Sequence, residues 1–323
     1  KVIPNLLITN LDQSGYFNVT TWERIRDLLK QVGKGDTEFI NTDLGFELCQ
    51  KDGVEVIVLG LVSKSGNTFV TDAKVLAVDT KKLLGTANSR GDSPDSIFKN
   101  QIDELSRQIA KSVGLPERRI ESAKMQVRDV TTSSAEAYTH YLKGSEALTN
   151  FDWVEARQSF EKAVEIDPTF ATAYYSLAFA NYMLANGREG TEAVKKAREF
   201  SQKATDKERL LIEAQYASAV ENDRGKRLRI LKEAADKYPR EKEVHTLLAM
   251  EYSGRGMREQ SIDEYNKVLA FDPNNPDALN MIAYEYLYMQ DFDKAVEYFN
   301  KYVAVLPGHP NPLDSLAEAY FWM

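Results

Sequence analysis

The sequence has one cysteine, three histidines and no phosphate-binding or nucleophile motif, and each shortage excludes a class of protein. Cys49 alone cannot form an internal disulfide or a cysteine-based metal cage. His140, His245 and His309 show none of the spacings that zinc sites use. No glycine-rich dinucleotide fingerprint or serine-nucleophile elbow occurs. We therefore expect a non-enzymatic protein with no catalytic residue, no cofactor and no metal.

Positive charge and long apolar runs are also scarce. The chain holds 41 Lys and Arg against 49 Asp and Glu, a net charge of -8. Nucleic-acid binding needs clustered positive charge, so we exclude nucleic acid as a partner. The longest apolar run, 54–62, contains Glu55 and falls well short of the roughly 20 residues that a membrane span requires. The sequence predicts no membrane insertion within these residues.

What the sequence does have is a repeat. Pro239, Pro273 and Pro307 stand 34 residues apart, and each closes a helix-like segment. Small residues such as Gly144 and Ala283 recur where the two helices of a hairpin would cross closely. This period and pattern are typical of the tetratricopeptide (TPR) repeat, a helical hairpin. We predict an all-α TPR superhelix, an α-solenoid, over 135–323, with about five hairpins and a truncated sixth.

The second, third and fourth repeats depart from the usual pattern. Pro168 lies 71 residues before Pro239, which is two periods plus three residues. We place this insertion near 186–190. When the closing proline of each repeat is counted as position 32, Ala193 then takes repeat position 20, which usually holds a small residue. Arg227 and Ser261 take that position in the third and fourth repeats. These repeats are therefore predicted to be irregular.

Residues 1–116 lack the period and differ in composition. Only Tyr16 of the 16 tyrosines lies before residue 130. This shift predicts a separate α/β domain at 1–116, with helices on a mixed sheet, and a linker at 117–134.

Local patterns predict the elements of this α/β domain. Tyr16 to Val19 reads as a short strand, and Thr20 with Glu23 three residues later forms a capping box that opens a helix. Three further strands should form an antiparallel meander: 54–62, 68–78 and 83–87. A helix that begins near Pro94 and ends at Gly114 follows.

Five short segments, distributed over nearly the whole chain, are similar to those of a known family: 4–11, 52–60, 77–80, 208–214 and 310–316. On these segments the chain resembles proteins that join a TolB-like N-terminal domain to TPR repeats. The resemblance implies the C-terminal sensor or regulatory region of a bacterial serine/threonine protein kinase or adenylate cyclase. It also implies a membrane helix upstream, with this region either in the periplasm or in the cytoplasm. The family's domain usually opens with an apolar strand that is missing here, so we expect a fragment of a longer protein.

The first helix of each TPR hairpin lines the concave groove of the superhelix, so its exposed positions are candidates for partner binding. These positions are rich in aromatic residues, and their few charges are mostly acidic. The candidate groove residues are Tyr138, Tyr141, Leu142, Tyr175, Phe179, Tyr182, Tyr216, Met250, Asn280, Met281, Tyr284, Tyr288 and Asn311. Aromatic side chains supply much of the contact energy at interfaces, which favours a partner peptide or helix, or self-association.

Two alternatives stay open. Some of these aromatic residues could pack between repeats, because stacked repeats bury a continuous core. The chain could also be a small-molecule receptor, with its ligand in the α/β domain or at the junction Arg118 to Ser134. Of the basic residues that some TPR domains use to clamp a terminal carboxylate, only Arg209 is at a suitable position. We therefore predict that carboxylate-terminal peptides of the chaperone type do not bind.

Overall fold

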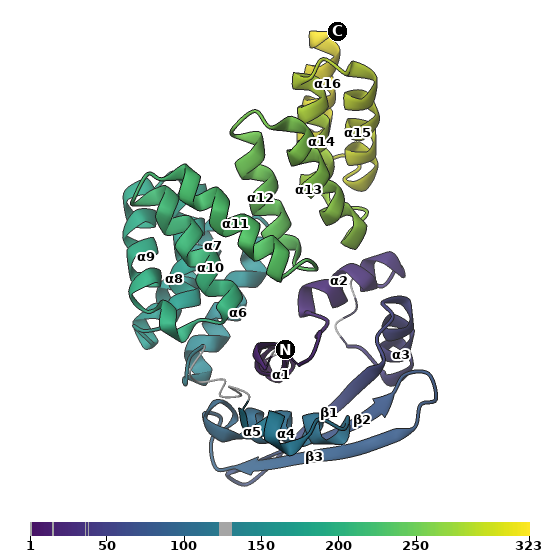
Figure 1. The fold of residues 1–323 in the computed structure, drawn as a ribbon, viewed down its shortest axis with the longest axis vertical. Helices are drawn as coiled ribbons and strands as arrows, with labels where there is room; N and C mark the ends of the chain where they lie inside the picture. The colour runs from purple at the N-terminus through teal and green to yellow at the C-terminus, as the bar shows by residue number, and fades with distance from the viewer. Residues whose placement is uncertain (1, 15, 36, 38, 123–130) are drawn as a thin grey trace. The chain divides into compact units, whose positions relative to one another are not determined.

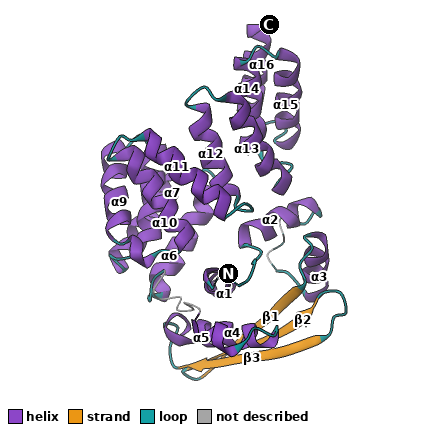
Figure 2. Cartoon of the chain, in the orientation of Figure 1, coloured by secondary structure: helices purple, strands orange, loops and turns teal. Residues whose placement is uncertain are grey.

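The computed structural model describes residues 2–14, 16–35, 37, 39–122 and 131–323. The chain divides into two compact units, 1–212 and 213–323, which we call unit 1 and unit 2. Unit 1 holds a small sheet with its helices and the first TPR helices, and unit 2 is helical throughout its described length (Figures 1 and 2). The expected fold class, a sheet-and-helix N-terminal part followed by an all-α TPR solenoid, is confirmed.

Three helices precede the sheet: α1 (Val2–Gln13), α2 (Trp22–Gln31) and α3 (Thr42–Lys51). The cap of α2 is Thr21, whose hydroxyl accepts a hydrogen bond from the Arg24 amide at 3.2 Å. The predicted cap, Thr20, is wrong by one residue, because its hydroxyl donates to Asp52 instead. The predicted strand at 16–19 is also wrong. That segment has no regular secondary structure, and its side chains Phe17 and Val19 pack against the core cluster around Leu105 and Ile109.

The sheet is a three-stranded antiparallel meander in the order β1-β2-β3. Its strands are β1 (Val56–Ser65), β2 (Thr68–Ala77) and β3 (Leu83–Gly91). Ser65 pairs with Thr68 across a two-residue turn in which Gly66 has φ +58°, a value that glycine adopts without strain. The meander is confirmed, and every described pairing is antiparallel, whereas we had expected a mixed sheet.

A helical segment covers one face of the sheet. One π-helical turn, Ile97–Gln101, leads into α4 (Ile102–Ser112), and α5 (Glu117–Ser122) follows. Leu105 and Ile109 of α4 pack on Val75 and Ala87 of the strands. On the opposite face, Phe46 of α3 packs on Ile57 of β1. The α/β part therefore has apolar packing on both faces of its sheet.

The repeats form five hairpins and one further helix among the described residues. The hairpins are α6 (Ala135–Thr149) with α7 (Trp153–Ile166), α8 (Ala171–Met183) with α9 (Gly187–Glu199), α10 (Asp206–Ala219) with α11 (Arg224–Lys237), α12 (Lys242–Ser253) with α13 (Arg258–Phe271), and α14 (Pro276–Tyr288) with α15 (Phe292–Val305). Helix α16 (Pro310–Trp322) begins the sixth repeat.

Each hairpin turns at one residue with a left-handed backbone. The five residues and their φ angles are Phe151 (58°), Ala185 (59°), Asn222 (55°), Gly256 (71°) and Gln290 (62°). They mark repeat position 15 and are 34 residues apart, except for the 37 residues between Ala185 and Asn222. Both flanking helices, α8 and α9, have ordinary bounds. The three extra residues therefore lie after α9, at the 3-10 turn Ser201–Lys203, and the predicted insertion near 186–190 is wrong.

This register moves repeat position 20 of the second repeat from Ala193 to Gly190. Gly190 is buried, and a Cβ atom there would lie 2.7 Å from the ring of Tyr182. The position therefore requires its glycine. The sequence misled us because Gly190 and Ala193 are both small and are three residues apart on the same helix.

The core of the α/β part continues into the first repeats. Leu6 of α1 and Phe98 form one buried cluster with Tyr138 of α6 and Phe170, the residue before α8. The amide of Ala135 donates to Asp95 at 3.0 Å, which fixes the start of α6 to the segment that precedes α4. In unit 1 the sheet-bearing part and the first TPR hairpin are consequently one packed body.

Candidate functional site

The predicted groove residues of the first repeat lie in the core. Tyr138 is 4% exposed, and its ring lies 5.4 Å from that of Phe98. The ring centroid of Tyr141 lies 5.1 Å from that of Phe170. Leu142 packs against the same buried cluster of Leu6, Phe98 and Phe170. Side chains of α1 and α4 cover Tyr138 and pack against the half-buried Tyr141 and Leu142, so the three residues serve packing within unit 1.

The second repeat is divided between core and surface. Tyr175 is half-buried against α9 and the residues that follow it, and the half-buried Tyr182 holds its hydroxyl 3.3 Å from that of Thr191. Phe179, in contrast, is 40% exposed. Tyr216 of α10 is half-buried. Of these four groove candidates, Phe179 is the most exposed.

Phe179 belongs to an aromatic row that the sequence analysis missed. Its ring lies 6.1 Å from that of Trp153, which lies 5.6 Å from that of Phe151. The side chain of Phe151 is 55% exposed. Its backbone is left-handed, a conformation that costs a bulky residue conformational energy. Phe151 and Trp153 belong to the hairpin turn and the second helix. Because we searched only the first helices, they were not considered.

Unit 2 brings most of its predicted residues together. We call the exposed side of α12, α14 and α16 the first-helix face. Met250 is 51% and Tyr288 59% exposed on it. Tyr284 stacks on Tyr288 with 6.2 Å between ring centroids and meets the buried ring of Phe299 edge-on at 5.1 Å. The aromatic pair is therefore fixed from beneath by the core and open on its outer side.

Of the remaining candidates of unit 2, Met281 and Asn280 lie on α14 with this pair and Asn311 lies on α16. Met281 is half-buried and packs against the cluster around Ile282. Asn280 is also half-buried, and its Oδ1 is enclosed without a hydrogen-bond partner among the described residues. Asn311 is exposed and accepts a hydrogen bond from the hydroxyl of Tyr302 at 3.2 Å.

Carboxylates are the exposed charges of the first-helix face. Asp277, Asp314 and Glu318 are exposed, and the Tyr284 hydroxyl donates to Glu318 at 2.9 Å. Burial, with a hydrogen bond to Glu318 adding to it, raises the pKa of Tyr284. Burial raises the pKa of Asp277, with Lys242 opposing the change. Of these carboxyl groups, Asp277 thus has a cation, Lys242, near it.

Beneath the surface, buried carboxylates join successive repeats of unit 2. Glu251 is 5% exposed and lies 3.0 Å from Arg227 and 2.8 Å from Arg255. Glu285 is fully buried and lies 2.8 Å from Arg258. Arg227, Arg255 and Arg258 are thus engaged with internal carboxylates.

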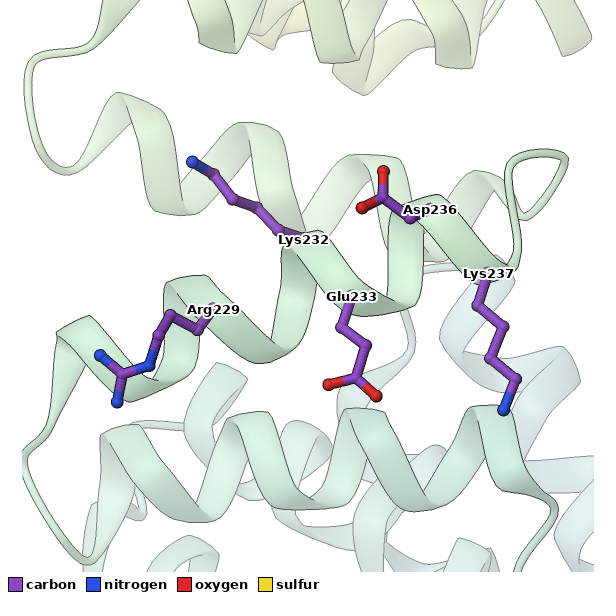
Figure 3. A pocket seen from close by; sticks show the side chains of 5 residues that line it. All are labelled: Arg229, Lys232, Glu233, Asp236 and Lys237. Carbon is purple, nitrogen blue, oxygen red and sulfur yellow. The ribbon is translucent and has the colours of Figure 1, made fainter.

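A shallow hollow of about 560 Å³ lies beside α11 and is lined by charged side chains alone: Arg229, Lys232, Glu233, Asp236 and Lys237. In Figure 3, Glu233 and Lys237 point to one side of the helix and Lys232 and Asp236 to the other. The lining mixes both signs of charge on one helix and includes no aromatic anchor. It therefore lacks the hydrophobic and aromatic side chains that usually line small-molecule sites.

The proposed ligand site at the junction Arg118 to Ser134 falls partly outside the described residues, since 123–130 are not described. Its described ends are packed: Ile120 is 8% exposed, and the buried Thr132 donates to Asp167 at 2.5 Å. Among the described residues, no cluster of His, Cys, Asp and Glu could hold a metal ion. No helix in the described ranges is both long and apolar enough to span a membrane.

Comparison with known proteins identifies the repeats. Residues 152–184 match a family model described as TPR repeat, and 243–275 and 264–297 match models described as tetratricopeptide repeat. No curated protein matches the chain.

Several solved structures are similar in fold to part of the chain. TTC0263, a thermophilic TPR protein of Thermus thermophilus, is 21% identical over 57% of this chain and 99% of its own, with a TM-score of 0.45. YrrB, described as a TPR protein with an unusual peptide-binding site, is 20% identical over 55% of this chain and 91% of its own, with a TM-score of 0.35. PilW, a type IV pilus biogenesis factor, is 16% identical over 58% of this chain and 91% of its own, with a TM-score of 0.44. The matched residues fall on α7 and α8 and on α12 to α15, and they show that these parts of the chain are tetratricopeptide repeats.

Proposed function

We propose that this chain is a non-enzymatic interaction module that binds a partner polypeptide on the first-helix face of unit 2. TPR arrays act as protein-interaction scaffolds, and their stacked hairpins create extended binding surfaces. The observation that carries the proposal is the stacked pair Tyr284 and Tyr288, with Tyr288 59% exposed. A rigid, exposed aromatic anchor is the kind of residue that dominates binding energy at interfaces.

The partner in this proposal is a peptide, a helix or a second copy of this chain. The predicted residues of the first repeat are left out of the binding surface because they are covered. Phe179 is kept as a second, smaller contact point in unit 1. A small-molecule receptor is not favoured by any specific observation on the described residues.

The test uses a random peptide phage library panned on the intact chain. Recovered peptides are re-measured on the variant Tyr288→Ala with Met250→Ala, and on a control, Leu61→Ala with Leu84→Ala, which removes exposed apolar side chains from the sheet instead. We expect the peptides to lose binding to the first variant and to keep it with the control. Equal binding to both variants would place the binding surface elsewhere.

We further propose that occupancy of this face regulates an attached signalling domain. The support is the resemblance of segments 4–11, 52–60 and 77–80 to the TolB-like domain of bacterial kinases and cyclases. The measurement is the activity of the full-length protein's signalling domain with and without a saturating peptide from the panning. An unchanged activity would reduce the role of this chain to that of a scaffold.

A further inference from the structure

We propose that the first-helix face of unit 2 takes a polypeptide segment that carries lysine or arginine side chains beside apolar ones. This inference rests on the proposed function and names the chemistry of its partner. The residues that define the surface come from three helices: Met250, Asp277, Asn280, Tyr284, Tyr288, Asp314 and Glu318.

Charge is the first argument. None of the ion pairs between described residues involves Asp277, Asp314 or Glu318, and all three side chains are exposed. Two cations lie beside this face, Lys242 near Asp277 and Arg258 near Tyr288, and each is paired with a buried carboxylate. Lys242 lies 3.6 Å from the buried Asp272, and Arg258 lies 2.8 Å from the buried Glu285. Because these two cations already have buried partners, the exposed carboxylates leave the face with a net negative charge, which attracts a basic segment and repels an acidic one.

The aromatic pair is the second argument. The guanidinium of Arg258 lies 4.6 Å from the ring centroid of Tyr288, so this ring already accepts a cation on one face. Tyr288 remains 59% exposed. An exposed tyrosine beside carboxylates can contact both the apolar stem and the charged end of a lysine or arginine side chain. The Tyr284 hydroxyl also holds Glu318 in place before any partner arrives.

Asn280 lies on α14 one turn after Asp277 and one turn before Tyr284, so the three side chains share one side of the helix. Its Oδ1 is enclosed and has no hydrogen-bond partner among the described residues, so this atom is not a contact for a bound segment. The site thus offers rings for apolar contact and carboxylates for cations.

The experiment measures fluorescence anisotropy with three labelled peptides of equal length and apolar content. The peptides carry only lysine, only glutamine or only glutamate at their polar positions. We expect the intact chain to bind the lysine peptide most tightly, with weaker binding as salt is added, because exposed charges are screened. The triple variant Asp277→Asn, Asp314→Asn and Glu318→Gln should weaken binding of the lysine peptide about tenfold, since three attractive charges are lost.

The control variant changes the net charge equally on the second helices, with Glu259→Gln, Asp263→Asn and Asp293→Asn, all exposed. It should leave the affinity for the lysine peptide unchanged. Equal weakening by both variants, or equal binding of the lysine and glutamate peptides, overturns the inference. If the glutamine peptide binds best and Tyr288→Ala abolishes its binding, the proposed function stands and the basic partner is wrong. If no peptide depends on Tyr288, both are wrong.

Discussion

Ser261 donates a hydrogen bond to the buried carboxylate of Glu285 at 3.1 Å, across the boundary between two successive repeats. The two residues are 24 positions apart. Arg227 and Glu251 have the same separation and are joined at 3.0 Å. Ala295 and Ala319 also have it and share one apolar cluster. The residues at repeat position 20 that looked irregular in the sequence are thus matched to a polar partner in the next repeat.

Removing one member of such a pair should destabilise unit 2. Glu285→Ala removes the carboxylate partner of Arg258 and leaves Ser261 its hydrogen bond to the Ala249 carbonyl at 3.0 Å. Breaking a buried ion pair costs about 3–5 kcal/mol. Because Arg258 is partly exposed and can regain water, we expect a loss of about 3 kcal/mol in the free energy of unfolding. Urea denaturation measures it. Glu259→Ala on the exposed side of α13 is the control and should stay within about 0.5 kcal/mol.

The coupling of Ser261 to Glu285 is a separate expectation. In a double-mutant cycle, Ser261→Ala should cost less stability when Glu285 is already alanine, because the hydrogen bond is then absent. Purely additive losses would show that the 24-residue relationship carries no interaction energy.

The same substitution, glycine to alanine, should have opposite effects at the left-handed Gly256 and at Gly187. Gly256→Ala adds a Cβ atom that meets nothing within 4 Å, so the cost comes from the backbone, with φ at +71°. We expect a loss of about 1 kcal/mol, the left-handed penalty less the entropy gained in the unfolded chain. Gly187→Ala, at the first position of α9 and equally uncrowded, should raise stability instead. Thermal unfolding of both variants checks the sign, and a gain at Gly256 would contradict the assigned turn.

Tyr138 and Tyr288 should behave in opposite ways, although both were predicted to line one groove. Tyr138→Ala empties a core position and should destabilise the protein by about 3–5 kcal/mol. Tyr288→Ala removes an exposed ring and should cost no more than about 1 kcal/mol while reducing peptide binding. Chemical denaturation together with peptide anisotropy separates the two effects. A stable Tyr138→Ala protein that loses peptide binding would return Tyr138 to the binding surface.

Stability at low pH should depend on Glu264. Burial alone would raise the pKa of this carboxyl group, but hydrogen bonds from His245 and Lys267 hold it below its ordinary value of 4.5. Its ionised form therefore contributes stability that is complete above pH 4.5 and is lost as the pH falls through the lowered folded-state pKa. Glu264→Gln should show a flatter loss of unfolding free energy over this range than the native chain. Glu259→Gln serves as the exposed control, and an identical slope for all three proteins would rule out this role.

Cys49 should react slowly. Burial, with the nearby Asp52 adding to it, raises the pKa of its thiol from 9.0 to about 11. Because the thiolate is the reactive form, alkylation by iodoacetamide at neutral pH should be far slower than that of a free cysteine. The rate should climb steeply between pH 9 and 11, and urea should restore the ordinary rate. Fast alkylation of the folded chain at neutral pH would contradict a shielded thiol.

The sequence by itself determined the repeat architecture and the meander. The 34-residue proline period, the small residues at helix crossings and the alternation within strands each recur at a fixed spacing, so these patterns can be recognised along the chain. It failed where the evidence was local but ambiguous, as with Gly190 and Ala193, or where a one-residue shift decided a cap, as with Thr20 and Thr21.

Only the tertiary structure decided which aromatic residues are available to a partner. Tyr138 and Tyr288 are both tyrosines on the first helix of a hairpin, yet one is 4% and the other 59% exposed. The difference comes from Leu6 and Phe98, which lie far from Tyr138 in sequence and cover it in the fold. The same holds for Arg227 and Ser261, whose carboxylate partners come from the next repeat. Burial and pairing depend on what packs from elsewhere in the chain, and a single helix does not carry that information.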